Sequence, residues 1–187
     1  MREEIAHQVE LAADLRAAGY AVRRTSSLKR FNELLEKASK NRHPDAKTIV
    51  VVDAHGRLMR DKPGSPSVIT DGKRAQQLDK LARALSLVPG RTFLAINSCH
   101  FQLKPFKEGL EKGRLSVFSG NSTNPEQRGA NHLPFFYALR KGLRGRQVVR
   151  ATREAAEEAS RKIPLGSRVL GLVGGTGYLR ASGPEIF

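Results

Sequence analysis

The stretch KTIVVVDAHG, residues 47 to 56, decides the fold. Residues 48 to 52 are all β-branched, which is typical of a strand that is buried on both faces in the middle of a parallel sheet. The apolar run ends at Asp53, and His55 and Gly56 follow almost at once. In open α/β sheets, sites lie at the carboxyl ends of the strands. The stretch therefore predicts a central parallel strand with a candidate site residue, His55, at its mouth.

Two further apolar runs follow the same pattern, and helical patterns separate them. RTFLAINS (91–98) and RLSVFSGNS (114–122) predict buried strands, and Cys99 comes directly after the first of them. Helical spacing of apolar residues predicts helices over five ranges, the second capped by Ser27: 3–18, 28–41, 73–88, 133–145 and 147–163. Strands over 20–27 and 167–175 and polar loops over 57–67 and 123–132 complete the expected order. This alternation predicts one α/β domain over residues 1–187, a three-layer sandwich with a mostly parallel central sheet.

Composition narrows the setting of the protein. The chain has 187 residues, 39% of them hydrophobic, which suits one folded domain. It has a single cysteine, so no internal disulfide forms, and a reducing, cytoplasmic location is expected. There is no apolar run long enough to span a membrane, and the charged first 20 residues lack the core of a secretory signal.

A formal net charge of +15 is the strongest compositional signal. It favours an anionic partner, such as nucleic acid, or alternatively an arginine-rich surface that is merely solvated. The basic residues are spread along the chain, and tryptophan is absent, so stacking platforms for bases are sparse. Nucleic acid is therefore the less favoured partner.

His55 and Cys99 are separated by 44 residues, the length of one loop and one helix. A single right-handed crossover of this kind makes the two strands parallel and adjacent, so both residues are expected at one edge of the sheet. A thiolate attacks carbonyl carbon, an imidazole protonates the leaving amine, and the N–H groups of Gly56 and Cys99 are candidates to bind the oxyanion. The alternative is ordinary: a lone buried cysteine acts as a small apolar residue, and a lone histidine belongs to a loop.

IVVVDAHG (49–56) followed by FLAINSCH (93–100) resembles the caspase-like cysteine peptidases, which include caspases, metacaspases, legumains and gingipains. In that group one apolar strand ends in His-Gly, and the next ends in a small residue and the catalytic cysteine. SCH at 98–100 looks most like the metacaspase form, and the resemblance extends over about residues 5 to 175. It implies a caspase-haemoglobinase-like fold and a cysteine endopeptidase that works through an acyl-enzyme. It makes His55 and Cys99 the catalytic dyad and the amides of Gly56 and Cys99 the oxyanion hole.

The same resemblance implies a substrate pocket and requires no third catalytic residue beside the dyad. Ser119, Asn121 and Ser122, at the end of the third strand, fall where relatives contact a protein or peptide substrate. Two residues before the cysteine, relatives carry Asp, Glu or Gln in the pocket for the side chain that precedes the cut; here Asn97 stands there. Asn97 brings no charge, so it cannot form an ion pair with a basic side chain of the substrate. Arg57 or Arg60 would suit a pocket that reads an acidic one.

Other departures leave a second interpretation open. Phe101-Gln102 follows the Cys99-His100 pair and makes the site entrance bulkier than in relatives. Relatives begin with a strand before the first helix, and that strand is apparently missing here, which admits an activating partner or a homo-oligomer. The alternative function is a catalytically inactive caspase-like module that binds protein or nucleic acid through a basic surface.

Two smaller expectations concern side chains around the dyad. Asp53 is positioned in sequence to orient the His55 imidazole, unless the alternation of the strand turns it elsewhere. His100 and His132 do not form a metal-binding spacing with Cys99, so neither a metal nor another cofactor is expected.

Overall fold

The structure, a computed structural model, describes residues 2–40, 43, 45–60, 65–122, 125–144, 147–161 and 179–182. Its main sheet has the order β1-β5-β6-β7, with bounds Lys47–Asp53, Arg91–Cys99, Leu115–Ser122 and Leu179–Ser182. The first three strands are parallel, and β7 runs antiparallel to β6. A second, small antiparallel sheet joins β2 (His55–Leu58), β3 (Ser67–Thr70) and β4 (Ala75–Gln77). The predicted α/β class and the mostly parallel sheet are confirmed.

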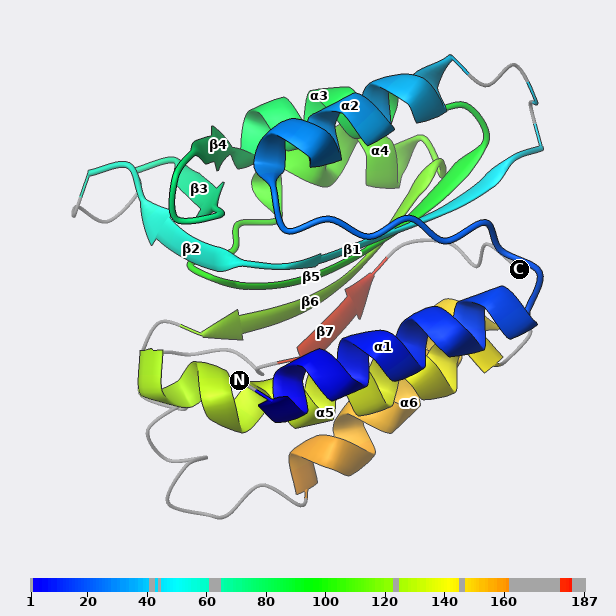
Figure 1. The fold of residues 1–187 in the computed structure, drawn as a ribbon, viewed down its shortest axis with the longest axis vertical. Coiled ribbons are helices and arrows are strands. Elements are labelled where there is room, and N and C mark those ends of the chain that lie inside the picture. The colour runs from blue at the N-terminus through cyan, green and yellow to red at the C-terminus, as the bar shows by residue number, and fades with distance from the viewer. Residues whose placement is uncertain are drawn as a thin grey trace.

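Helices cover both faces of the main sheet (Figure 1). One face carries α1 (Arg2–Ala17), α5 (Pro125–Arg144) and α6 (Val148–Arg161). The other carries α2 (Leu28–Ser39), α3 (Leu78–Ser86), the short 3₁₀ turn η1 (Lys104–Phe106) and α4 (Lys107–Glu111). The small sheet extends from the end of β1, beyond the edge where the parallel strands finish.

Alternation along β5 divides the core into two parts. Phe93 and Ala95 pack with α1, α5 and α6, while Leu94 and Ile96 pack with α2, α3 and η1. All four side chains are fully buried. A strand that is apolar on both faces is what a parallel sheet between two helical layers requires. Because side chains alternate along β5, Asn97 and Cys99 lie on the same face of the sheet as Phe93 and Ala95, the face toward α1, α5 and α6.

Several predicted elements differ from the structure. Residues 21–25 form no strand and pass extended along the β1 side of the molecule (Figure 1). The predicted polar loop over 123–132 is wrong, because α5 begins at Pro125, and proline at the first helical position was the signal to read. The predicted loop over 57–67 contains the second half of β2, and the first part of the helix predicted over 73–88 forms β4, so that α3 begins only at Leu78. The strand predicted over 167–175 lies outside the described residues, and β7 was not predicted.

The start of α2 is fixed by two side chains. The Ser27 hydroxyl accepts a hydrogen bond from the Arg30 N–H, which confirms the predicted cap. The Asp71 carboxylate, in the turn between β3 and β4, accepts one from the Leu28 N–H at 2.8 Å. Backbone N–H groups of Leu28, Arg74 and Lys73 hold the pKa of Asp71 below its ordinary value. The small sheet and α2 are thereby joined at one carboxylate.

Among the described helices, none combines the length and the apolar character that a membrane crossing requires.

Candidate active site

The pairing of β1 with β5 brings the two sequence motifs to one edge of the sheet. The strands are parallel and in a register that sets Asp53 opposite Asn97. Just beyond β1, the Ala54 N–H donates to the Asn97 carbonyl at 3.2 Å, and β2 begins at the next residue, His55. The predicted adjacency of the two strands is confirmed. It places His55 and Cys99 at neighbouring positions where the parallel strands end.

Gly56 lies directly against the backbone of Cys99. A Cβ atom built on Gly56 would overlap the carbonyl oxygen of Cys99 and the hydroxyl of Ser98. Only glycine, which has no Cβ, permits this approach between the start of β2 and the end of β5. The glycine of the His-Gly pair therefore has a steric role at the site, independent of any role in catalysis.

Regular strand geometry gives the sides of β2 and β5 to which the Gly56 and Cys99 N–H groups point. The Met59 N–H bonds to the Pro66 carbonyl at 2.9 Å, so hydrogen-bonded pairs along β2 and β3 fall on alternate residues, and the Gly56 N–H points away from β3. In β5 the Asn97 carbonyl accepts from the Ala54 N–H. Two residues further on, the Cys99 N–H repeats that direction. The Cys99 N–H therefore points to the β1 side of β5.

Strand β5 ends sharply after the thiol. Cys99 is buried, at 8% exposed, and His100 has a φ of +56°, in the left-handed region that non-glycine residues rarely occupy. The Ser67 hydroxyl, from the start of β3, donates to the His100 carbonyl. This backbone strain is of the kind that clusters at functional sites, and here it turns the chain away immediately after Cys99.

Asn97, two residues before Cys99 on β5, forms a polar pair with Asp53. The Asn97 amide donates to one Asp53 carboxylate oxygen at 3.1 Å, and the Gln8 amide, from α1, donates to the other at 3.1 Å. Asn97 is 3% exposed, and Asp53 is half-buried. Arg24 bonds in turn to the Gln8 side-chain oxygen at 3.4 Å. The predicted pocket residue Asn97 is therefore a donor that fixes Asp53.

Gly120 makes room for Asn97. It is the register partner of Asn97 on β6, and a Cβ there would lie 2.7 Å from the Asn97 Oδ1 and 3.2 Å from the Phe135 ring. Sequence reasoning did not single out Gly120 or Gln8. A glycine inside the strand pattern of 114–122 was the only signal for the first, and no sequence signal pointed to the second.

Of the predicted substrate-binding residues of β6, one lies away from the candidate site and two lie at its edge. Ser119 is buried and pairs with Ile96, so it shares the α2–α3 face and is not brought to the face of Asn97 and Cys99. The backbones of Asn121 and Ser122 pair with Ser98 and Cys99 and reach the site edge.

Phe101 does not obstruct the site entrance, contrary to the expectation from its position after the cysteine. Its ring is 8% exposed, stacks on Phe106 at 5.6 Å between ring centroids, and belongs to the core beneath α2 and α3. Gln102 donates to the Ser65 carbonyl at 3.0 Å. The segment after His100 is thus a structural anchor on the face opposite the thiol.

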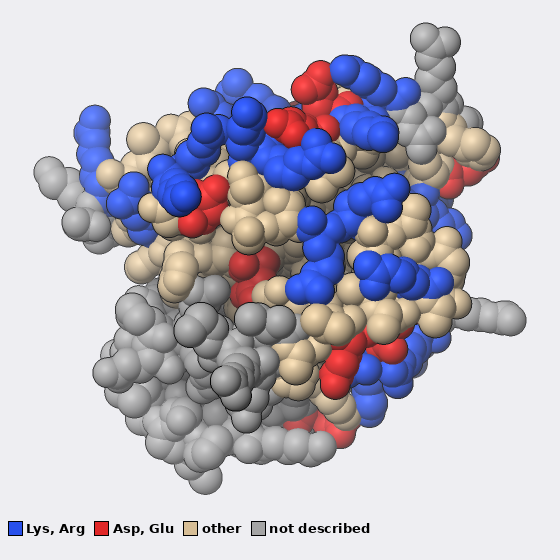
Figure 2. Space-filling model, in the orientation of Figure 1, with Lys and Arg blue, Asp and Glu red and all other residues tan. Residues whose placement is uncertain are grey.

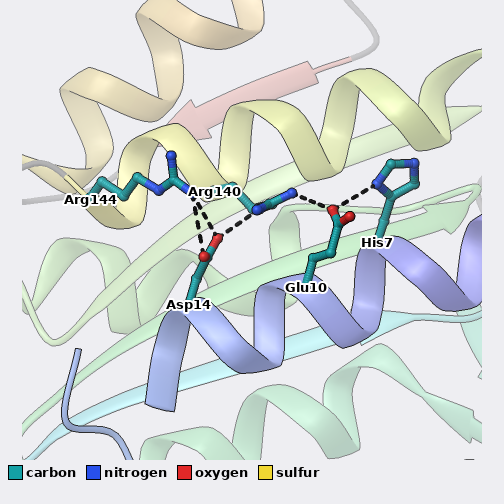
Figure 3. A network of polar contacts seen from close by, with 5 residues as sticks. All are labelled: His7, Glu10, Asp14, Arg140 and Arg144. Carbon is teal, nitrogen blue, oxygen red and sulfur yellow. Dashed lines mark hydrogen bonds and ion pairs between the residues drawn. The ribbon is translucent and has the colours of Figure 1, made fainter. Parts of the chain in front are cut away.

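Ionic contacts hold α1, and with it Gln8, against α5 (Figure 3). Asp14 accepts from Arg140 at 2.7 Å and from Arg144 at 3.2 Å, and Glu10 contacts both Arg140 and His7. The hydrogen bond from Arg140 holds the pKa of Asp14 below its ordinary value. The network fixes the helix that delivers Gln8 to Asp53.

Two further observations bear on the chemistry. Within the part of the chain that the structure describes, no three His, Cys, Asp or Glu side chains gather to hold a metal ion. A cavity of about 330 Å³ lies at the opposite end of the strands, between α3 and α4, and its lining includes Thr92, Arg83 and Lys112. That lining mixes both signs of charge and contains none of the predicted site residues.

Comparisons with protein-family models, with curated proteins and with solved structures find no match to this chain.

Proposed function

We propose that this protein is a cysteine endopeptidase of the caspase-like type, with a caspase-haemoglobinase-like three-layer fold and a His55–Cys99 dyad. The observation that carries the proposal is the contact of Gly56 with the Cys99 carbonyl. It supports the proposal because it joins the two motifs that resemble that family at a single sheet edge. The small antiparallel sheet that starts at His55 is consistent with it.

The proposed reaction has two stages. The Cys99 thiolate attacks the scissile carbonyl carbon, a C–S bond forms, and the oxyanion accepts hydrogen bonds from the N–H groups of Gly56 and Cys99. Protonated His55 gives its proton to the leaving amine as the C–N bond breaks. Water, deprotonated by His55, then attacks the acyl-enzyme and releases the acid product and the thiol.

Covalent labelling of Cys99 by peptide acyloxymethyl ketones tests this proposal. Attack by the thiolate on the probe displaces the carboxylate leaving group, so the adduct mass counts reacted molecules. We expect peptide-dependent labelling of the wild type that falls at least a hundredfold in His55→Ala, since general acid–base catalysis supplies about 10² to 10⁴ in rate. Cys99→Ser controls for the labelled atom. His43→Ala controls for the substitution, because His43 is exposed and lies in the turn before β1, at the end of that strand remote from the site.

If every peptide labels Cys99 only at the rate of a free thiol, in the wild type as in His55→Ala, the proposal of a peptidase is overturned. The outcome would then favour a non-catalytic module. Figure 2 gives that alternative its specific support, since Lys and Arg side chains cover much of the face over α2, with acidic side chains among them.

A further inference from the structure

We infer that the cavity at the amino ends of β5 and β6 binds a small monocarboxylate that carries an apolar chain. The inference does not depend on the proposed peptidase function, because this cavity lies at the end of the parallel strands remote from Cys99. Its volume of about 330 Å³ is at the lower end of the range of about 300–1,000 Å³ that is typical of ligand pockets. The size therefore suits a small molecule, and the lining indicates its chemistry.

The walls and the base of the cavity are apolar. Ala82 of α3 and Pro105 of η1 are half-buried, so they present apolar surface on two opposite walls. Phe106 and Leu115 are buried at the base. An apolar chain between these walls removes apolar surface from water on both molecules, which favours binding.

Two arginines supply the charge that binds an anion. Arg83, in the last turn of α3, and Arg114, directly before β6, both line the cavity and are exposed. Within the described part of the chain, neither guanidinium forms an ion pair or a side-chain hydrogen bond. The planar guanidinium fork matches the two oxygens of a carboxylate. The two arginines are therefore the groups that hold the head of the ligand.

The acidic side chains of the lining do not cancel this charge. Glu108 is already paired with Lys112, one helical turn further along the chain. Asp79, on α3, has no ion-pair partner among the described residues. Two unpaired arginines and one unpaired aspartate leave the lining with a single positive charge. A monoanion balances that charge, whereas a cation increases the imbalance and a dianion reverses it.

A threonine hydroxyl adds a hydrogen-bond donor to the lining. Thr92 begins the buried part of β5, is 2% exposed, and lies on the same face of the strand as Leu94, toward α3. Its N–H donates to the Arg114 carbonyl at 2.8 Å, so these two lining residues are neighbours. The Thr92 hydroxyl has no hydrogen-bond partner among the residues that the structure describes. A carboxylate oxygen in the cavity can accept from it.

Isothermal titration calorimetry of the full chain with octanoate tests the inference. Octanamide keeps the chain and loses the charge, octylamine reverses the charge, and acetate keeps the charge and loses the chain. We expect octanoate to bind at least about tenfold more tightly than each of them, because charge-assisted hydrogen bonds to arginine and burial of the chain are both needed.

Exchange of the two arginines tests the residues themselves. Arg83→Gln combined with Arg114→Gln should weaken octanoate binding by at least about tenfold and leave octanamide binding unchanged. Both side chains are exposed, so the variant is expected to fold. Arg16→Gln is the matched control, because Arg16 is also an exposed arginine in the last turn of a helix, but that helix covers the other face of the sheet. Octanoate binding should be unchanged in it.

Methyl resonances in NMR spectra locate the bound octanoate. We expect the methyl signals of Leu85, Val88 and Leu115, which line the cavity, to shift on titration. The methyl signals of Leu11 and Leu139, in the core on the other face of the sheet, should stay in place.

Three results would overturn the inference. They are octanoate binding no tighter than that of octanamide, octanoate binding that survives the double arginine exchange, and methyl shifts confined to residues outside the cavity. A short peptide with a C-terminal leucine that binds more tightly than octanoate would replace the free acid with a protein terminus as the ligand. None of these measurements uses Cys99 labelling, so failure of this inference and failure of the peptidase proposal are distinguished.

Discussion

At the scale of single residues, Gly56 is the most constrained position of the candidate site. Gly56→Ala would force a Cβ into the Cys99 carbonyl and the Ser98 hydroxyl. Because the obstacle is mostly backbone, we expect a loss of about 1–3 kcal/mol in the free energy of unfolding, measured by urea denaturation. His55-dependent labelling of Cys99 should be lost together with the approach of the two strands.

Gly19→Ala is the matched control for that substitution. The backbone at Gly19 has a φ of +88°, a conformation that favours glycine, but a Cβ there would meet nothing within 4 Å. We expect about 1 kcal/mol of destabilisation from the left-handed backbone and unchanged labelling per folded molecule. Equal labelling in Gly56→Ala and Gly19→Ala would show that the close approach at Gly56 is unnecessary for the site.

The arrangement of the candidate residues was predictable only in part, for physical reasons. That His55, Gly56 and Cys99 come to one edge of the sheet was predictable, because they follow uninterrupted apolar runs and the order of parallel strands fixes which ends meet. The partnership of Asp53 with Asn97 depends on strand register, and no local pattern encodes register between parallel strands. Gln8 lies on a helix whose position depends on tertiary packing, so its contact with Asp53 could not be predicted from the sequence.

At the scale of elements, α1 depends on carboxylates that face α5. Asp14 has a pKa held below its ordinary value of 3.8 by the hydrogen bond from Arg140 and by the nearby charges of Arg140 and Arg144. A carboxyl group with a lowered folded-state pKa stabilises the fold at pH values above its unfolded pKa. That stabilisation is lost as the pH falls through the lowered, folded-state value.

Asp14→Asn should therefore reduce stability at neutral pH and lose its effect in acid. We expect about 1 kcal/mol at pH 7, a modest value because these side chains are partly solvated. Urea denaturation between pH 7 and pH 3 should show the difference from wild type shrinking toward the acid end. Glu36→Gln, which removes an exposed pair with Lys40, should change stability little; a pH-independent loss in Asp14→Asn would contradict the ionic account.

Elements were predicted best where periodicity was long. Clear apolar patterns marked three strands and three helices, and the bounds of each were predicted within a few residues. These elements are β1, β5, β6, α1, α2 and α6. The small sheet was mostly missed because β2, β3 and β4 span only three or four residues each. The first half of α5 was read as a loop because its sequence, PEQRGANH, lacks an apolar stripe.

At the scale of the whole molecule, the net charge of +15 gives a test of the alternative function. Acidic side chains are interspersed among the basic ones over α2 (Figure 2), so we expect only non-specific, salt-sensitive contact with DNA. Fluorescence anisotropy with a labelled duplex should show binding at about 20 mM salt that is lost by about 200 mM, because counterion release drives such binding. Binding that persists at the higher salt concentration would support a nucleic-acid module.

The register between β1 and β5 also makes the candidate site a sensor of folding. His55 follows β1 by two residues and Cys99 ends β5, and the pairing of these strands closes a long stretch of chain. Such non-local contacts form only once the loop-closure entropy has been overcome. An unfolded or partly folded chain still has a thiol and an imidazole, but they are not held together. A His55-dependent label on Cys99 would therefore count native molecules in a refolding mixture, and its rate of appearance would time the docking of β1 onto β5.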